Sequence, residues 1–282
     1  MSPLNTLEGH VALVTGASRG IGRAIALRLA AHGAAVALVS SARSEQGLND
    51  TREKIVALGG RALALVADLA DETARAGLVA RAAAGLGAVD ILVNNAAGIS
   101  AYAPPSKIDL PARRAMFELN FQAPVDLIQQ ALPDMRARGW GRVVNIGSET
   151  ANQPPIPYPG PARLIHALTV YGASKAALDR YSLGLAAELH GSGIHINALA
   201  PYRIALSESA EAVARQTAAA HPDWVEPLEM MAEAAYLLIA GNWTGLVVKS
   251  RELLQLAQAP LHALDGRSVI GDATTLVDFL RN

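Results

Sequence analysis

Short apolar runs alternate with longer amphipathic runs along most of the 282-residue chain, and no other feature constrains the fold as strongly. The apolar runs are continuous rather than alternating in polarity, which is typical of parallel strands buried on both faces. Seven strands are predicted, at His10–Thr15, Ala35–Ser40, Ala62–Ala67, Asp90–Asn94, Arg142–Ile146, Ile194–Leu199 and Gly245–Lys249. Helices are predicted at Ile21–His32, Gly47–Leu58, Thr73–Leu86, Ala112–Arg138, Tyr171–His190 and Leu228–Ala240. This order predicts an α/β fold: a Rossmann-type, doubly wound sheet of seven mainly parallel strands flanked by helices.

Nothing in the sequence divides the chain into separate domains, because it contains no repeats, charge blocks or long linkers. We therefore expect one domain over residues 1–282, a length that α/β folds reach. Residues 151–170 hold five prolines, which predicts a stiff, irregular insertion. Residues 251–282 follow the last strand as an extension, with helices expected at Arg251–Gln258 and Thr274–Leu280.

Composition excludes several classes of function. Lys+Arg and Asp+Glu total 24 and 25, so a net charge of −1 provides no bulk attraction to nucleic acid or an acidic membrane. Cysteine is absent, which excludes disulfides, thiolate metal sites and a Cys nucleophile. The seven histidines lack metal-ligand spacing, so no metal is expected. The first ten residues do not resemble a secretion signal and no apolar run reaches the ~20 residues of a membrane span, so a cytoplasmic protein is expected.

Three glycines, Gly16, Gly20 and Gly22, lie between the first predicted strand and the first helix. Glycine permits a tight turn with positive φ and lets a pyrophosphate approach the backbone without a Cβ in the way. The free N–H groups at the start of the helix can then hold the anion. The turn predicts dinucleotide binding, with a tight packing turn as the alternative.

The Gly-x3-Gly-x-Gly spacing resembles that of the short-chain dehydrogenase/reductase family, in its compact single-domain branch. Further motifs follow in the family's order: Asn94–Gly98, Asn120, Ser148, Tyr171 with Lys175, and Asn197–Pro201. The resemblance covers about residues 8–206 and is extended by the helix–strand pair at Leu228–Lys249. It implies an NAD(P)-dependent enzyme acting on CH–OH/C=O groups, with the helices at Ala112–Arg138 and Tyr171–His190 forming the faces of a homodimer or homotetramer.

Tyr171 and Lys175 are four residues apart, so both side chains share one helix face. A tyrosine, whose usual pKa is about 10, is a poor base at neutral pH, but a nearby ammonium favours its phenolate. Ser148 can donate a hydrogen bond to the same substrate oxygen. A Tyr-x3-Lys pair alone is more often a solvated helix face. The family resemblance implies that Lys175 also binds the nicotinamide ribose and that Asn120 holds a water in a proton relay.

The end of the second strand bears on the choice of cofactor. NAD-specific members of the family carry an acidic residue there, which holds a ribose hydroxyl. Here that position is Ser40, so a 2′-phosphate would meet no repulsion, and Arg43 and Arg19 can bond it. NADP(H) is therefore favoured, and NAD(H) is the alternative if both arginines face solvent.

Two polar residues near the expected adenosine have alternative roles. Asp68 resembles the family's aspartate at the adenine edge, although Asp also caps helices well. Asn94 borders the adenosine side or only ties the fourth strand to its neighbours. The full set of expected cofactor contacts is Gly16, Ser18, Arg19, Gly20, Ile21, Gly22, Ser40, Ser41, Arg43, Asp68, Leu69, Asn94, Ala96, Tyr171, Lys175, Pro201 and Ile204.

The sequence departs from the family pattern after the sixth strand, where Pro-Gly is replaced by Pro201-Tyr202 and a later Thr by Leu206. Ile204 is expected to reach the nicotinamide carboxamide through its backbone, and Ser207 to substitute for the Thr. Tyr202 lies against the substrate or packs within the loop. The spacing of 23 residues from Ser148 to Tyr171 exceeds that of the family. The insertion is therefore expected to form one wall of the substrate site; the alternative is a surface loop without this role.

The sequence therefore predicts an NADP(H)-dependent oxidoreductase that transfers hydride between the nicotinamide and a carbonyl/secondary alcohol pair. Tyr171 is the expected general acid/base, and Asn120, Ser148 and Lys175 complete the catalytic set. The alternatives are a noncatalytic nucleotide-binding regulator, or enoyl or imine reduction on the same scaffold. The low charge of the region favours a fairly apolar small-molecule ketone or alcohol.

Overall fold

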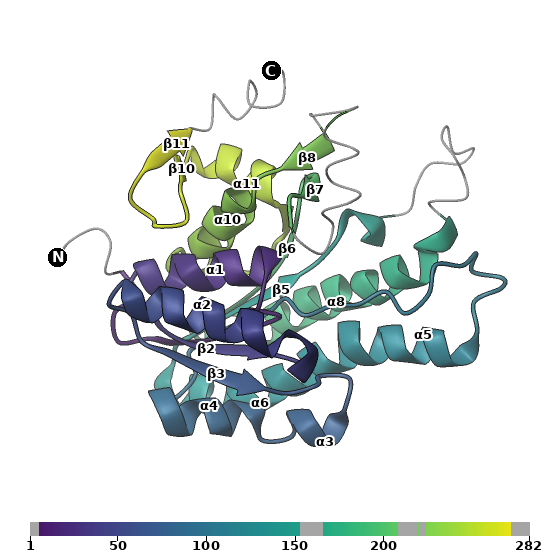
Figure 1. The fold of residues 1–282 in the computed structure, drawn as a ribbon, viewed down its shortest axis with the longest axis horizontal. Helices are drawn as coiled ribbons and strands as arrows, with labels where there is room; N and C mark the ends of the chain where they lie inside the picture. The colour runs from purple at the N-terminus through teal and green to yellow at the C-terminus, as the bar shows by residue number, and fades with distance from the viewer. Residues whose placement is uncertain (1–5, 153–165, 208–218, 220–223, 272–282) are drawn as a thin grey trace.

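The computed structural model describes residues 6–152, 166–207, 219 and 224–271 (Figure 1). Its centre is a sheet of seven parallel strands in the order β3-β2-β1-β4-β5-β6-β9. The strands are β1 Val11–Thr15, β2 Ala35–Ser40, β3 Ala62–Val66, β4 Ile91–Asn94, β5 Gly141–Ile146, β6 Ile194–Ala200 and β9 Val247–Lys249. All seven predicted strands are present, with ends within two residues of the prediction, and the predicted Rossmann-type fold is confirmed.

Helices cover both faces of this sheet, because successive residues of each strand point to opposite sides. In β1, Leu13 belongs to one apolar core and Val14 to the other. The first core lies under α4 Leu78–Leu86, α6 Ala123–Arg138 and α8 Thr169–Glu188. The second lies under α1 Gly20–Ala31, α2 Glu45–Ala57, α10 Leu228–Ala240 and α11 Ser250–Ala257.

Two predicted helices are interrupted. The prediction of one helix at Thr73–Leu86 is wrong: α3 Glu72–Arg75 ends before Gly77, whose φ of +67° is left-handed, and α4 follows. The prediction of one helix at Ala112–Arg138 is also wrong. Instead, α5 Leu110–Phe117 leads into a π-helical turn, η2 Glu118–Gln122, and then into α6.

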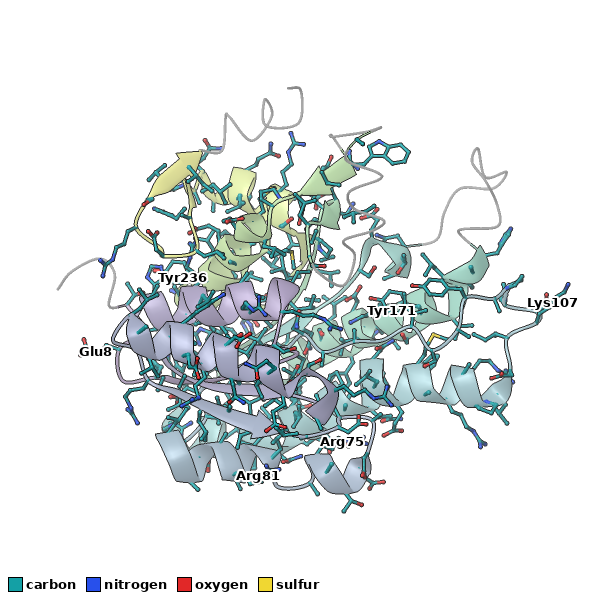
Figure 2. All side chains as sticks on the ribbon, in the orientation of Figure 1. Glu8, Arg75, Arg81, Lys107, Tyr171 and Tyr236 are labelled. Atoms are coloured by element: carbon teal, nitrogen blue, oxygen red, sulfur yellow. The ribbon has the colours of Figure 1, made fainter. Side chains whose placement is uncertain are left out.

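Pro124, in the first turn of α6, accounts for the π-helical turn. A proline has no N–H to donate to the carbonyl four residues earlier, and its ring crowds that carbonyl. In this chain that carbonyl belongs to Asn120, so α-helical bonding is lost at this residue. The widened turn is held from outside by Arg75 (Figure 2), which pairs with Glu118 at 2.5 Å and with Asp126 at 2.6 Å.

The chain after β9 packs on the sheet's second face. The helix predicted at Arg251–Gln258 is present as α11, and β10 Leu261–His262 then pairs with β11 Val269–Gly271. The predicted helix at Thr274–Leu280 and most of the proline-rich insertion lie outside the described residues. In the part of the chain that the structure describes, no helix is long and apolar enough to cross a membrane.

Candidate active site

A cavity of about 420 Å³ opens at the carboxyl ends of the central strands. The strand order reverses between β1 and β4, and in open α/β sheets ligands bind at such a switch point. Fourteen of the expected site residues line it: Gly16, Ser18, Arg19, Gly20, Ile21, Ser40, Ser41, Asp68, Leu69, Ala96, Ser148, Tyr171, Lys175 and Pro201. Ser207, expected to substitute for the family's Thr, lines it too. The cavity therefore brings together the glycine turn, the end of β2 and the Tyr/Ser/Lys group.

The glycine turn occupies the junction of β1 and α1. Gly16 and Gly20 have φ values of +65° and +56°, in the left-handed region that favours glycine. A Cβ on Gly16 would lie 2.6 Å from Asn95 Nδ2. Gly22 does not line the cavity; its missing side chain instead lets α1 pack against the Gly16 carbonyl. The first turn of α1 holds no acidic residue, so no carboxylate of that turn opposes the positive end of the helix dipole.

Two residues that sequence analysis missed brace this turn. Asn95 Nδ2 donates to the Thr15 carbonyl at 2.8 Å and to the Gly16 carbonyl at 3.3 Å. In return, Thr15 Oγ1 accepts from the backbone N–H groups of Asn95 and Ala96 at 2.9 and 3.0 Å. Their positions in the sequence could have identified them, because Thr15 directly precedes Gly16 and Asn95 directly follows Asn94.

Ser148 and Tyr171 meet where β5 ends beside α8. The Ser148 side chain lies near enough to the Tyr171 hydroxyl to lower its pKa. Ser148 Oγ also accepts from Thr150 Oγ1 at 2.9 Å, which directs the serine's own proton away from Thr150. Figure 2 shows Tyr171 beside the ribbon of α8. Burial raises the pKa of the Tyr171 hydroxyl, while Ser148 lowers it. A tyrosine in this state is protonated at neutral pH and can act as an acid.

Lys175 lies under this pair with 2% of its surface exposed. Its Nζ donates to the Ile146 carbonyl at 2.7 Å and lies 6.0 Å from the centroid of the Tyr171 ring. Burial lowers the Lys175 pKa to about 8, against the opposing effect of Asp179. The expected lowering of the Tyr171 pKa by this ammonium does not appear: burial raises that pKa, and only Ser148 lowers it. Below about pH 8 the ammonium is nevertheless present beneath the cavity.

Asn120 is fully buried in the π-helical turn and does not line the cavity. Its Nδ2 donates to the Gly98 carbonyl at 3.0 Å and to Ser174 Oγ at 3.1 Å, and its Oδ1 accepts from Gly98 N at 2.9 Å. The side chain therefore ties the loop after β4 to α8. The backbone carbonyl of Asn120 cannot accept an α-helical bond from Pro124, which has no N–H.

The end of β2 has serines where an acid would repel a 2′-phosphate. Ser40 and Ser41 line the cavity, as does Arg19, whereas Arg43 lies outside the lining in the short helix η1 Ala42–Ser44. Asp68 also lines it, with Oδ1 accepting from Ala70 N at 3.0 Å. The cap of α3 is Asp71, not Asp68, so the capping alternative for Asp68 does not hold for this helix.

Two further expected contacts lie behind the cavity wall. Asn94 Nδ2 donates to Asn145 Oδ1 at 2.8 Å across the β4–β5 pair, with Asn94 2% exposed. The residue thus serves the strand-tying alternative in this structure. Ile204 lies in the short strand β7 Ile204–Ala205, outside the lining. Among the described residues, no group of three His, Asp or Glu side chains could hold a metal ion.

The short chain dehydrogenase family matches residues 10–218. A short chain dehydrogenase of Pseudocercospora fijiensis is 37% identical over 220 residues, covering 77% of this chain and 66% of that protein. The ketoacyl reductase HetN of Nostoc sp. is 36% identical over 198 residues, covering 70% of this chain and 64% of that protein. The chain therefore spans slightly less than two thirds of these relatives.

Solved structures agree with the family match. A 3-oxoacyl (acyl-carrier-protein) reductase of Agrobacterium tumefaciens with NADP bound has a TM-score of 0.75 at 32% identity, covering 86% of this chain and 93% of that one. A short chain dehydrogenase of Burkholderia cenocepacia in complex with NADP has a TM-score of 0.74 at 33% identity, covering 87% and 97%. With most of the chain matched and the family's motifs gathered at one edge of the sheet, this protein belongs to the short-chain dehydrogenase family.

Proposed function

We propose that the chain is an NADP(H)-dependent oxidoreductase acting on a carbonyl/secondary alcohol pair. The observation that carries the proposal is the gathering of Tyr171, Ser148 and Lys175 in the wall of one cavity, with Ser148 close enough to Tyr171 to lower the pKa of its hydroxyl. The bound nicotinamide would supply or accept the hydride. Relatives named as a ketoacyl reductase and a 3-oxoacyl reductase support the same class of substrate.

The described residues fit a dinucleotide phosphate. The Cβ-free surface of Gly16 and the positive N-terminal end of α1 suit a pyrophosphate. At the other end of the cavity, Ser40 and Ser41 leave room for a 2′-phosphate, and Arg19 offers a charge-assisted bond. The two solved relatives that hold NADP support this preference over NAD.

In the reductive direction, Tyr171 would donate its proton to the substrate oxygen as negative charge develops there. Ser148, whose proton points away from Thr150, would stabilise that oxygen first and the tyrosine phenolate afterwards. Lys175, held by the Ile146 carbonyl, would keep a positive charge beneath the phenolate and bind ribose hydroxyls. Asn120 would link Lys175 to solvent through a water held by its backbone carbonyl. The remaining expected cofactor contacts that line the cavity, including Asp68, belong to the same proposal.

We also propose a cytoplasmic homo-oligomer. The lack of cysteine fits a reducing compartment. The helices α5 and α8 contact each other and expose Leu110 and Leu183, 46% and 40% exposed, on the helices that the family uses for assembly. Light scattering of the purified protein would show a mass of at least two chains. A monomer at all concentrations would contradict this part of the proposal.

The decisive experiment is oxidation of NADPH and NADH against a panel of ketones, aldehydes and 3-oxoacyl thioesters. We expect NADPH to be preferred and Tyr171→Phe to lower turnover by about 10²–10⁴-fold, because the general acid is lost. Tyr181→Phe is the matched control on the same helix; its ring packs edge-on to Phe121 with centroids 6.1 Å apart, so turnover should persist. Wild-type turnover in Tyr171→Phe would refute the mechanism, and cofactor binding with no turnover of any substrate would favour the regulator.

A further inference from the structure

The segment that departs from the family pattern is held by a buried carboxylate. After β6, the backbone N–H groups of Tyr202 and Arg203 both donate to Glu226 Oε2, at 3.0 and 3.1 Å. Glu226 lies in the two-residue strand β8 Val225–Glu226, which pairs in parallel with the two-residue strand β7. A ladder this short has little stability of its own. The carboxylate, rather than the ladder, therefore fixes the backbone of this segment.

The carboxylate is in turn fastened to the C-terminal extension. Ser250, the first residue of α11, donates from Oγ to Glu226 and lies 3.0 Å from each carboxylate oxygen. Its Oγ also accepts from Tyr202 N at 3.1 Å. Glu226 is 1% exposed and Ser250 is fully buried. We call these four residues, Tyr202, Arg203, Glu226 and Ser250, the carboxylate clamp.

The clamp borders the active site on two sides. Pro201 directly precedes it and Ser207 follows the strand it holds, and both line the cavity. On the other side, the guanidinium of Arg203 lies 4.5 Å from the centroid of the Tyr202 ring and Lys249 Nζ lies 5.7 Å from it. Lys249 also bridges to Glu149, the residue after Ser148, at 2.6 Å. A shift of the clamp would therefore move the cavity wall and disturb the neighbour of Ser148.

We propose that Glu226 is a positioning residue of the active site: it holds the backbone of Tyr202 and Arg203, and through them the adjacent Pro201 of the cavity wall. The inference rests on the proposed function of the cavity as a dinucleotide site. Burying a carboxylate is costly, and apolar residues of similar volume often stabilise a fold as well or better. In this chain the bulky Tyr202 replaces the family's glycine. The N–H groups of Tyr202 and Arg203 converge on one acceptor, Glu226 Oε2.

Because Glu226 can ionise, its hold on the segment should depend on pH. Burial raises its pKa to about 7, opposed first by the Ser250 hydroxyl, then by the N–H groups of Arg203 and Tyr202 and the charge of Arg203. Among the described residues, the other charged groups around the clamp are Lys249 and Arg251, over the same Tyr202 ring, and Glu149 and Glu252, which pair with Lys249. Hydrogen bonds to an ionised acceptor are stronger than those to a neutral one. The segment should thus be held more tightly as pH rises through 7.

The test compares Glu226→Gln and Glu226→Ala in the full chain. NADPH affinity is measured by fluorescence between pH 5.5 and 8.5, and amide hydrogen exchange is followed over residues 201–207 without cofactor. The wild type should bind more tightly above pH 7. Glu226→Gln should bind within about twofold of the wild type but lose this dependence, because its amide carbonyl still accepts the two N–H groups. Glu226→Ala should bind about tenfold more weakly and exchange faster at Tyr202 and Arg203.

Glu233→Gln is the matched control for a purely structural loss. Glu233 is a buried carboxylate of α10, 3% exposed, that pairs with Arg28 away from the cavity. This variant should be less stable but keep the wild-type affinity and its pH dependence. The proposal is overturned if Glu226→Ala keeps the wild-type affinity, pH dependence and exchange rates. If the wild type binds no NADPH, the proposed function fails, and the exchange rates at Tyr202 and Arg203 alone decide whether Glu226 positions the segment.

Discussion

Lys175 and Asp179 lie one turn apart on α8, and their charges are coupled inside the fold. Burial raises the pKa of the Asp179 carboxyl to about 6, with Lys175 opposing the shift, so the carboxylate is charged above that pH. Asp179 Oδ1 is buried, and no described residue bonds it. It would lie 3.0 Å from a Cβ on Gly147, the residue between Ile146 and Ser148. Asp179 therefore provides a negative charge next to the strand end that holds the Lys175 ammonium.

We expect Asp179→Asn to shift the pH dependence of the enzyme. Removal of the carboxylate takes away the effect that raises the Lys175 pKa, so that pKa falls below about 8. The ammonium is then lost at lower pH, and the basic limb of kcat/KM moves to lower pH. The measurement is the pH profile of NADPH-dependent turnover. Asp134→Asn, at an exposed position of α6, is the control; equal basic limbs in Asp179→Asn and wild type would contradict the coupling.

At the scale of elements, the site depends on a close approach of α8 to the short helix η3 Glu149–Ala151. Gly172, next to Tyr171, makes this approach possible, because a Cβ there would collide with the Thr150 carbonyl. Gly184 lies on the same helix, but a Cβ there would meet only Arg180 Nη1, at 3.2 Å, the end of a flexible side chain. Of these two glycines, only Gly172 is required for the close approach of another backbone segment to α8.

Gly172→Ala should lower activity although alanine is the better helix former. We expect kcat/KM to fall by roughly 10–100-fold, because the added methyl group separates Ser148 from Tyr171. Gly184→Ala should keep the activity and raise the free energy of unfolding by about 0.5–1 kcal/mol. Steady-state kinetics and urea unfolding of both variants test this. Equal activity in the two variants would mean that the α8–η3 contact does not set the geometry.

At the scale of the whole molecule, one buried ion pair fastens the C-terminal extension to the sheet's second face. Arg28 of α1 is fully buried and pairs with Glu233 of α10. Its Nη2 donates to the carbonyls of His262 and Ala263, at 2.9 and 2.7 Å. These contacts join parts of the chain more than 200 residues apart. They lie at the end of α1 that is remote from the glycine turn.

Arg28→Met should destabilise the protein without weakening cofactor binding. Loss of the guanidinium leaves Glu233 buried without its main partner, which costs about 3–5 kcal/mol of unfolding free energy. The double variant Arg28→Met/Glu233→Gln should recover part of this, because no buried carboxylate remains. Denaturant unfolding and NADPH titration measure both effects. A double variant no more stable than Arg28→Met would show that the extension is held by other contacts.

Several parts of this fold and site were predictable from local patterns. The buried strands show as continuous apolar runs, and the glycine turn and the Tyr171/Lys175 pair show as fixed spacings, because strand burial and helix periodicity act over a few residues. Gly77 and Pro124 were visible as well, and their known backbone effects would have predicted the two helix interruptions. The role of Asn94 could not be decided from local patterns, because its hydrogen-bond partner Asn145 lies 51 residues away in the sequence.

The sequence by itself determined the order of strands and helices, the edge of the sheet at which a ligand binds, and the residue types gathered there. These follow from backbone propensity, hydrophobic periodicity and the topology of parallel sheets. Only the tertiary structure decided how the buried charges are partnered: Glu226 with Ser250, Arg28 with Glu233, and Lys175 with the Ile146 carbonyl. A buried polar group is satisfied by whatever the fold brings within hydrogen-bond distance, and that distance is set by packing rather than by position in the chain.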